Sequence, residues 1–105
     1  MRIKLYVTAD DAAALKEIAG GQAVAQFTRD AVLQAVESTL NRQTPPELVE
    51  IPRPLPRPTP YVMLPLDVSE YHLFCRAVAR ADLVPQAFAY SALRAAMVET
   101  SSTGR

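Results

Sequence analysis

The sequence contains few of the residue types on which disulfide frameworks, metal centres and phosphate loops are built. Among its 105 residues there are one cysteine, one histidine, three glycines and no tryptophan. A single cysteine excludes a disulfide framework and a thiolate metal cluster, and it suits a reducing compartment. Three glycines are too few for a loop that cradles phosphates. We therefore expect no catalytic residues, no metal and no cofactor, and we expect that the protein is not an enzyme.

A surplus of one charge sign and a long apolar run are also missing. Eleven basic residues balance eleven acidic ones, and half of all residues are apolar. This composition is typical of a folded globular protein, because disordered chains have fewer apolar residues. No apolar run approaches the roughly 20 residues of a membrane-spanning helix. The first residues lack the apolar stretch of a signal peptide, so we expect a cytoplasmic protein with no membrane contact.

Proline, in contrast, is concentrated in the segment 41–60, where seven of the nine prolines lie. Within it, every second residue from 52 to 60 is proline. Proline removes a backbone donor and disfavours the helical conformation of the preceding residue, which excludes a helix there. The segment is either a stiff linker or an edge strand whose prolines face outward, and we favour the linker. It separates residues 1–40 from residues 61–105.

The first half begins with an alternating pattern that predicts a strand. Residues 2–8 are apolar at odd positions and polar at even ones, a period of two. Thr8 and Asp11 then match a capping box, which marks the start of a helix. The Gly20-Gly21 pair predicts its end. A second helix is expected at 23–40, whose apolar residues cover more than one face and must be buried on several sides.

The second half repeats this order. The strand pattern returns 59 residues later, at 61–66, and Asp67 and Glu70 again resemble a capping box. In the second helix the offset between matching residues becomes 61, so that Phe88 corresponds to Phe27. Residues related by these offsets are called corresponding residues below.

A unit of roughly 40 residues is too small to bury its apolar faces alone, and a lone strand has no pairing partner. We therefore predict a mainly α-helical fold with a two-stranded antiparallel ribbon, in which two strand-helix-helix repeats, 1–40 and 61–100, pack as a pseudo-dimer. Residues 101–105 are expected to be a frayed tail. The strands could also pair between two chains. We favour pairing within one chain, because tethering raises the effective concentration of the partner.

This pattern resembles the ribbon-helix-helix family of DNA-binding proteins, to which Arc and MetJ belong. The resemblance rests on the strand at 2–8, the capped first helix, the Gly20-Gly21 turn and the apolar second helix. It covers nearly the whole chain if 61–100 is a diverged copy. It implies that the ribbon enters the DNA major groove and that each second helix holds a phosphate at its N-terminus. By analogy, the protein would be a transcriptional repressor, the DNA-binding part of an antitoxin or a plasmid-transfer accessory factor.

Candidate contacts to double-stranded DNA follow from these positions. On the outward face of the first strand, Arg2 and Lys4 can donate to guanine, and Tyr6 can bond a base or a phosphate. Phosphate contacts are expected from amides at the start of the second helix and from basic residues of the connection: Ala23, Val24, Ala25, Arg53 and Arg57. The two arginines of the connection are equally well explained as solubilising charges.

The outward positions of the second strand differ from those of the first. Tyr61, Met63 and Pro65 can touch a thymine methyl group but form few hydrogen bonds. Near the start of the second helices, Ala25 and Pro85 replace the small polar residue that is usual in the family. This face and the neutral net charge favour an alternative, a protein-interaction module of the same fold that has lost DNA binding. Its partner would be another protein or a second copy of the chain.

The remaining chemically reactive residues have structural explanations. Cys75 adjoins an apolar stripe and is expected to be a small buried residue. His72 is expected on the opposite, solvated side of that helix. Asp10, Asp11 and Glu70 are interpreted as charges that stabilise helix N-termini, and not as an acid/base pair.

Overall fold

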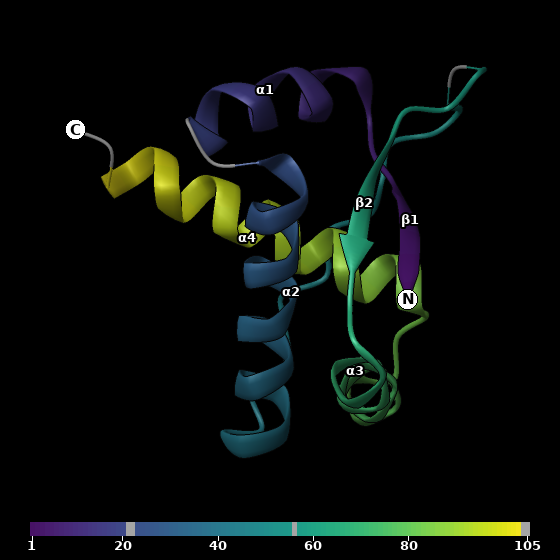
Figure 1. The fold of residues 1–105 in the computed structure, drawn as a ribbon, viewed down its shortest axis with the longest axis vertical. Helices are drawn as coiled ribbons and strands as arrows, with labels where there is room; N and C mark the ends of the chain where they lie inside the picture. The colour runs from purple at the N-terminus through teal and green to yellow at the C-terminus, as the bar shows by residue number, and fades with distance from the viewer. Residues whose placement is uncertain (21–22, 56, 104–105) are drawn as a thin grey trace.

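The computed structural model describes residues 1–20, 23–55 and 57–103, with side chains described as far as residue 100. The elements are β1 (Arg2–Tyr6), α1 (Ala9–Ala19), α2 (Val24–Asn41), β2 (Tyr61–Pro65), α3 (Val68–Ala81) and α4 (Pro85–Thr103). The fold is thus mainly helical with one two-stranded antiparallel sheet, which confirms the predicted class (Figure 1). We call β1, α1 and α2 the first half and β2, α3 and α4 the second half. The described residues between the halves contain neither helix nor strand.

The two strands pair in a register that separates a core face from an outer face. On the core side, Ile3 faces Leu64 and Leu5 faces Val62. The outer pairs are Arg2 with Pro65, Lys4 with Met63, and Tyr6 with Tyr61. Backbone bonds continue the ladder at both ends, from Val7 N to Pro60 O (3.1 Å) and from Leu66 N to Met1 O (2.8 Å). Residues of the outer face direct their backbone N–H to the free edge, so Pro65 removes no ladder hydrogen bond.

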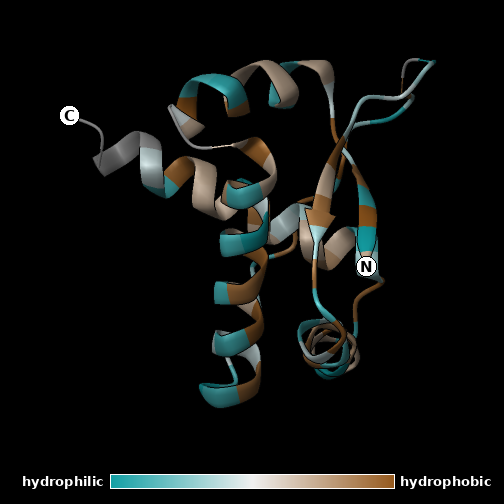
Figure 2. Ribbon diagram, in the orientation of Figure 1, coloured by the Kyte–Doolittle hydropathy of each residue, from teal (hydrophilic) through white to brown (hydrophobic). Residues whose placement is uncertain are grey.

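The core face of the ribbon and the apolar sides of the helices form one core. Its fully buried side chains include Leu5, Val7, Leu15, Val32, Leu64, Phe88 and Leu93. Figure 2 shows that α2 turns its apolar side toward the ribbon and α3 and its polar side away from them. Burial of each such leucine or phenylalanine contributes about 1.5–3 kcal/mol to stability.

The second helices pack across the molecule. The helix α2 lies mainly against β2 and α3 of the second half, and α4 lies against β1 of the first half. Each strand is therefore covered by the second helix of the other half. Because the core is shared in this way, neither half contains all of its own packing partners.

Both predicted capping boxes are present. Asp11 N donates to Thr8 Oγ1 (3.0 Å) and Thr8 N donates to Asp11 Oδ2 (3.2 Å) at the start of α1. At the start of α3, Asp67 and Glu70 form the same pair of bonds, at 2.7 and 2.9 Å. The helix α1 ends at Gly20, whose φ of 60° suits glycine. Gly21, the other residue of the predicted turn, lies outside the described residues.

One expectation needs correction. Cys75 is exposed and is not part of the core, whereas Phe74 beside it is buried. Successive residues of a helix are rotated by about 100°, which places Cys75 outside the buried stripe of α3 formed by Phe74, Ala77 and Val78. The helix α4 continues to Thr103. His72 is exposed, as predicted. Among the described helices, none is both long and apolar enough to cross a membrane.

Candidate nucleic-acid interface

The outer face of the ribbon brings together the six strand residues that the sequence singled out. Arg2, Lys4, Tyr6 and Tyr61 are exposed, and Met63 and Pro65 are half-buried. The alternation of each strand places these side chains opposite the apolar core residues. Basic, aromatic and apolar side chains therefore share one surface that the helices do not cover.

Three of these side chains touch one another. Lys4 Nζ lies 4.8 Å from the centroid of the Tyr61 ring, within the range of a cation–π contact. The rings of Tyr6 and Tyr61 meet edge to face, with their centroids 6.4 Å apart. Lys4 thereby interrupts the apolar surface that Tyr61 and Met63 would otherwise form.

Arg2 and Lys4 are the cations of the outer face. In the part of the chain that the structure describes, no carboxylate forms an ion pair with Arg2 or Lys4. An exposed cation without a protein partner retains its donors for an external acceptor, such as a base edge or a phosphate.

One edge of the ribbon is held by α4. Tyr6 N donates to Gln86 Oε1 (3.2 Å), and Gln86 Nε2 donates to Tyr6 O (2.8 Å). The side-chain amide of Gln86 thus occupies both backbone groups that Tyr6 presents at the free edge of β1. This contact joins residues 80 positions apart and had no signal in the sequence. It places the first turn of α4 beside the ribbon.

The starts of the helices fall into two classes. The helices α1 and α3 are capped by side chains and have acidic residues in their first turns. The helix α2 begins at the segment Ala23, Val24 and Ala25, where none of the described side chains caps it and its first turn has no acidic residue. The first turn of α4 also lacks an acidic residue. Uncapped amides at a helix N-terminus favour an anion, so these starts are the ones suited to a phosphate.

The two arginines of the connection are exposed. Arg53 lines a groove of about 740 Å³ together with Val84 and Gln86, so it lies near the start of α4. Arg57 precedes Tyr61 by four residues, and the connection extends past the end of the ribbon at which β2 begins (Figure 1). Arg53 thus lies beside the helix start that Gln86 ties to Tyr6, whereas Arg57 is placed only by its position in the exposed connection.

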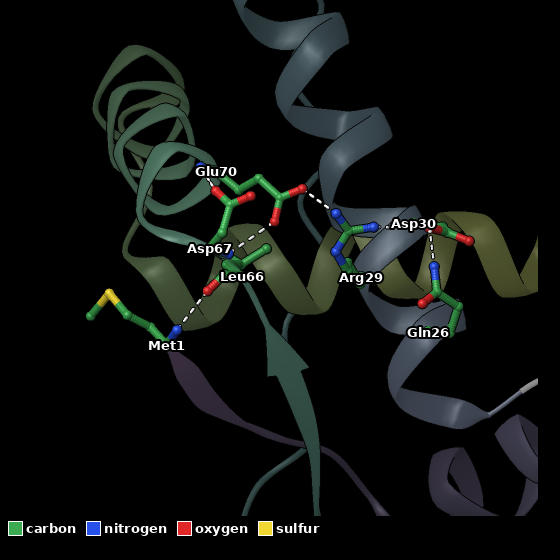
Figure 3. A network of polar contacts seen from close by, with 7 residues as sticks. All are labelled: Met1, Gln26, Arg29, Asp30, Leu66, Asp67 and Glu70. Carbon is green, nitrogen blue, oxygen red and sulfur yellow. Dashed lines mark hydrogen bonds and ion pairs between the residues drawn. The ribbon is translucent and has the colours of Figure 1, made fainter.

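Behind the ribbon, polar contacts join each second helix to the first helix of the other half. Arg29 of α2 donates to Glu70 at the start of α3 (Figure 3). Tyr90 of α4 donates to Asp11 at the start of α1 (2.6 Å), and Arg94 donates to the other oxygen of Asp11 (2.7 Å). Asp11 and Glu70 were predicted as helix-start charges, but these partners were not predicted.

Asp11 is the buried member of this network. Burial, the largest single influence, opposes its ionisation, but hydrogen bonds from Tyr90 and Thr8 and the charge of Arg94 together hold its pKa below the ordinary value. Burial, followed by the bond to Asp11, raises the pKa of Tyr90 to about 12. The pair therefore remains carboxylate and neutral phenol at physiological pH, which fixes α4 against α1.

The described residues contain no group of three histidine, cysteine, aspartate or glutamate side chains arranged to hold a metal ion. Comparisons with protein-family models, curated proteins and solved structures found no match to this chain. The resemblance to the ribbon-helix-helix family therefore stays a prediction from the residue pattern.

Proposed function

We propose that this chain binds double-stranded DNA by inserting the outer face of its β-ribbon into the major groove. The observation that carries the proposal is a two-stranded ribbon whose outer face holds Arg2 and Lys4, neither of which pairs with a carboxylate among the described residues. A two-stranded ribbon has dimensions that the major groove admits. In this proposal the two halves of one chain act as the two subunits of a ribbon-helix-helix dimer.

The contacts divide into base contacts and phosphate contacts. Arg2 and Lys4 donate to guanine O6 and N7, and the Tyr6 hydroxyl bonds a base or a phosphate. The amides at 23–25 and the first turn of α4 hold phosphates on the groove walls. Arg53 and Arg57 add phosphate contacts that do not depend on sequence. A protein that binds in this way acts by occupying its site, which suits a repressor or an accessory factor of DNA transfer.

The test is selection from a pool of random duplexes at low and moderate salt. Wild type is compared with Arg2→Ala/Lys4→Ala, and we expect wild type to enrich a motif that the double variant does not. Because a good base contact contributes about 1–3 kcal/mol, affinity for the enriched motif should fall at least about tenfold. The control is Lys16→Ala/Arg76→Ala, which removes the same charge at exposed positions of α1 and α3.

The second candidate is a protein-interaction module that retains the fold. The exposed rings of Tyr6 and Tyr61 beside Met63, together with the neutral net charge, favour it. The same experiment separates the candidates. If wild type binds no duplex even at low salt, the DNA proposal is wrong, and the ribbon face becomes the surface on which to seek a protein partner.

A further inference from the structure

The side chains on the outer face of the ribbon differ between its two ends, in addition to the difference between its two strands. The register gives three outer pairs along the ribbon: Arg2 with Pro65, Lys4 with Met63, and Tyr6 with Tyr61. We call the first pair the arginine end and the last pair the tyrosine end. A two-fold axis through the middle pair exchanges the strands, and it would exchange Arg2 with Tyr61. The difference in sequence between the halves thus becomes a difference along the length of the ribbon.

The arginine end presents one strong, planar hydrogen-bond donor. Arg2 is exposed and pairs with none of the described carboxylates. Pro65 opposite it has no polar side chain, so a single guanidinium determines what this end recognises. Guanidinium matches the O6 and N7 acceptors of guanine with two parallel hydrogen bonds.

The tyrosine end presents aromatic surface. Tyr6 is 41% exposed and Tyr61 is 47% exposed, and their rings meet edge to face. Because Lys4 Nζ lies over the Tyr61 ring, the cation of the middle pair is directed toward this end. Ring surface favours the methyl group of thymine, and the ammonium and the hydroxyls can donate to thymine O4.

The flanks of the ribbon reinforce this difference. Gln86 ties the start of α4 to Tyr6, and Arg53 lies beside that start. Arg57 is exposed in the connection four residues before Tyr61. The start of α4 and Arg53 are therefore available for phosphate contacts that would fix the position of the tyrosine end on the duplex.

We infer, on the basis of the proposed DNA-binding function, that one chain reads a duplex site without two-fold symmetry and binds it in one orientation. The site has a guanine under Arg2 and an A·T pair under Tyr6 and Tyr61. From Arg2 to Tyr6 the strand extends about 13 Å, at roughly 3.3 Å per residue. This corresponds to about four base-pair steps of roughly 3.4 Å, so the recognised site is about five base pairs long.

Orientation is measured with a reagent attached to Cys75. It is the single cysteine, it is exposed, and it lies on α3, which leaves the ribbon at the arginine end. A DNA-cleaving iron chelate is coupled to this thiol, and the protein is bound to the motif selected by wild type. We expect a motif that is not palindromic and cleavage only on the side of the guanine. We also expect Arg2→Ala to lose preference at that guanine alone, with about a ten- to hundredfold loss of affinity.

The decisive variant exchanges the two ends. Arg2→Tyr combined with Tyr61→Arg preserves composition and net charge, and both positions are exposed. In this variant the guanidinium lies at the tyrosine end, whereas Cys75 stays on α3. The chain should therefore bind the same motif in the reverse orientation, and cleavage should move from the guanine side of the motif to the A·T side. The single variant Tyr61→Phe is the matched control, since it retains the ring and the orientation.

The outcomes separate this inference from the function on which it rests. A palindromic motif, cleavage on both sides, or an unchanged cleavage position in the exchange variant would overturn the inference. Binding without any enriched motif would also overturn it while leaving DNA binding intact. Only a failure to bind duplexes at low salt would remove the proposed function itself.

Discussion

The contact between a second helix and the first helix of the other half occupies the same place in both halves but has different chemistry. Arg29 and Tyr90 are corresponding residues, as are Glu70 and Asp11, and each pair bonds across the halves. Glu70 accepts from a guanidinium, and both side chains are partly exposed. Asp11 accepts from a phenol and is almost wholly buried, with Arg94 one turn further along α4 as a second donor.

The comparison of Asp11 with Glu70 shows what is constant and what can vary at the third residue of each first helix. The third residue of each first helix accepts a hydrogen bond from the backbone N–H of the cap residue and thereby completes the capping box. The burial of that carboxylate then determines which hydrogen-bond donors can satisfy it. A surface carboxylate is satisfied by one mobile cation, whereas a buried carboxylate needs several fixed donors to offset the loss of water.

The largest effects are expected where the halves are alike, in the core. Leu5 and Leu64 are corresponding residues and are 1% and 0% exposed. Replacing either with alanine should lower the free energy of unfolding by about 3–4 kcal/mol, because each change leaves a cavity. Urea unfolding measures both, and Val68→Ala, at an exposed position, is the control. A loss at one leucine of less than half that at the other would show that the two positions are not equivalent within the shared core.

The next effect separates the two cross-half contacts. Asp11→Ala should cost about 3 kcal/mol, because it removes a helix cap and leaves the buried Tyr90 hydroxyl without an acceptor. Glu70→Ala should cost about 1 kcal/mol, since it removes a cap and a contact in which solvent screens the charges. Urea unfolding of the two variants gives the difference. Equal losses would mean that the burial of Asp11 does not set the strength of its contact.

Acidification tests the same contact without a change of packing. The pKa of Asp11 is lowered in the folded protein, so its contribution is complete above the ordinary value of 3.8 and is lost as pH falls through the lower folded value. We expect wild type to lose more stability than Asp11→Asn on acidification below about pH 4. Urea midpoints measured from neutral pH downward test this expectation. Parallel pH profiles for the two proteins would contradict it.

The sequence predicted the features that depend on neighbouring residues. The period of two located both strands, and the spacing from Thr8 to Asp11 and from Asp67 to Glu70 located the starts of α1 and α3. Alternation also predicted which strand residues face outward, and the repeat offset predicted that the strands are antiparallel partners. These patterns are local, or recur at a fixed distance along the chain.

The sequence did not predict contacts that depend on how the helices pack. Tyr90 bonds Asp11 from 79 residues away and Gln86 bonds Tyr6 from 80 residues away, and neither pair has a characteristic spacing. Cys75 was assigned to the core because it adjoins an apolar stripe, yet one step around the helix exposes it. How much of an apolar stripe is buried depends on the width of the element that packs against it. The periodicity of the sequence carries no information about that width.

The smallest effect concerns the clamp that only one half possesses. Gln86 corresponds to Ala25, and Tyr6 corresponds to Pro65, which has no N–H to donate. Gln86→Ala should therefore lower stability by about 1 kcal/mol through the loss of two exposed hydrogen bonds, whereas Ala25→Gln should gain less, because Pro65 offers only its carbonyl. Hydrogen exchange of the Tyr6 amide is the sharper readout, since the clamp alone protects it on the free edge. In Gln86→Ala we expect faster exchange of the Tyr6 amide and unchanged exchange of the Leu5 amide. Faster exchange at both residues would show instead that Gln86 stabilises the whole ribbon. The difference between the two edges of the ribbon would then come from packing and not from the hydrogen bonds of Gln86.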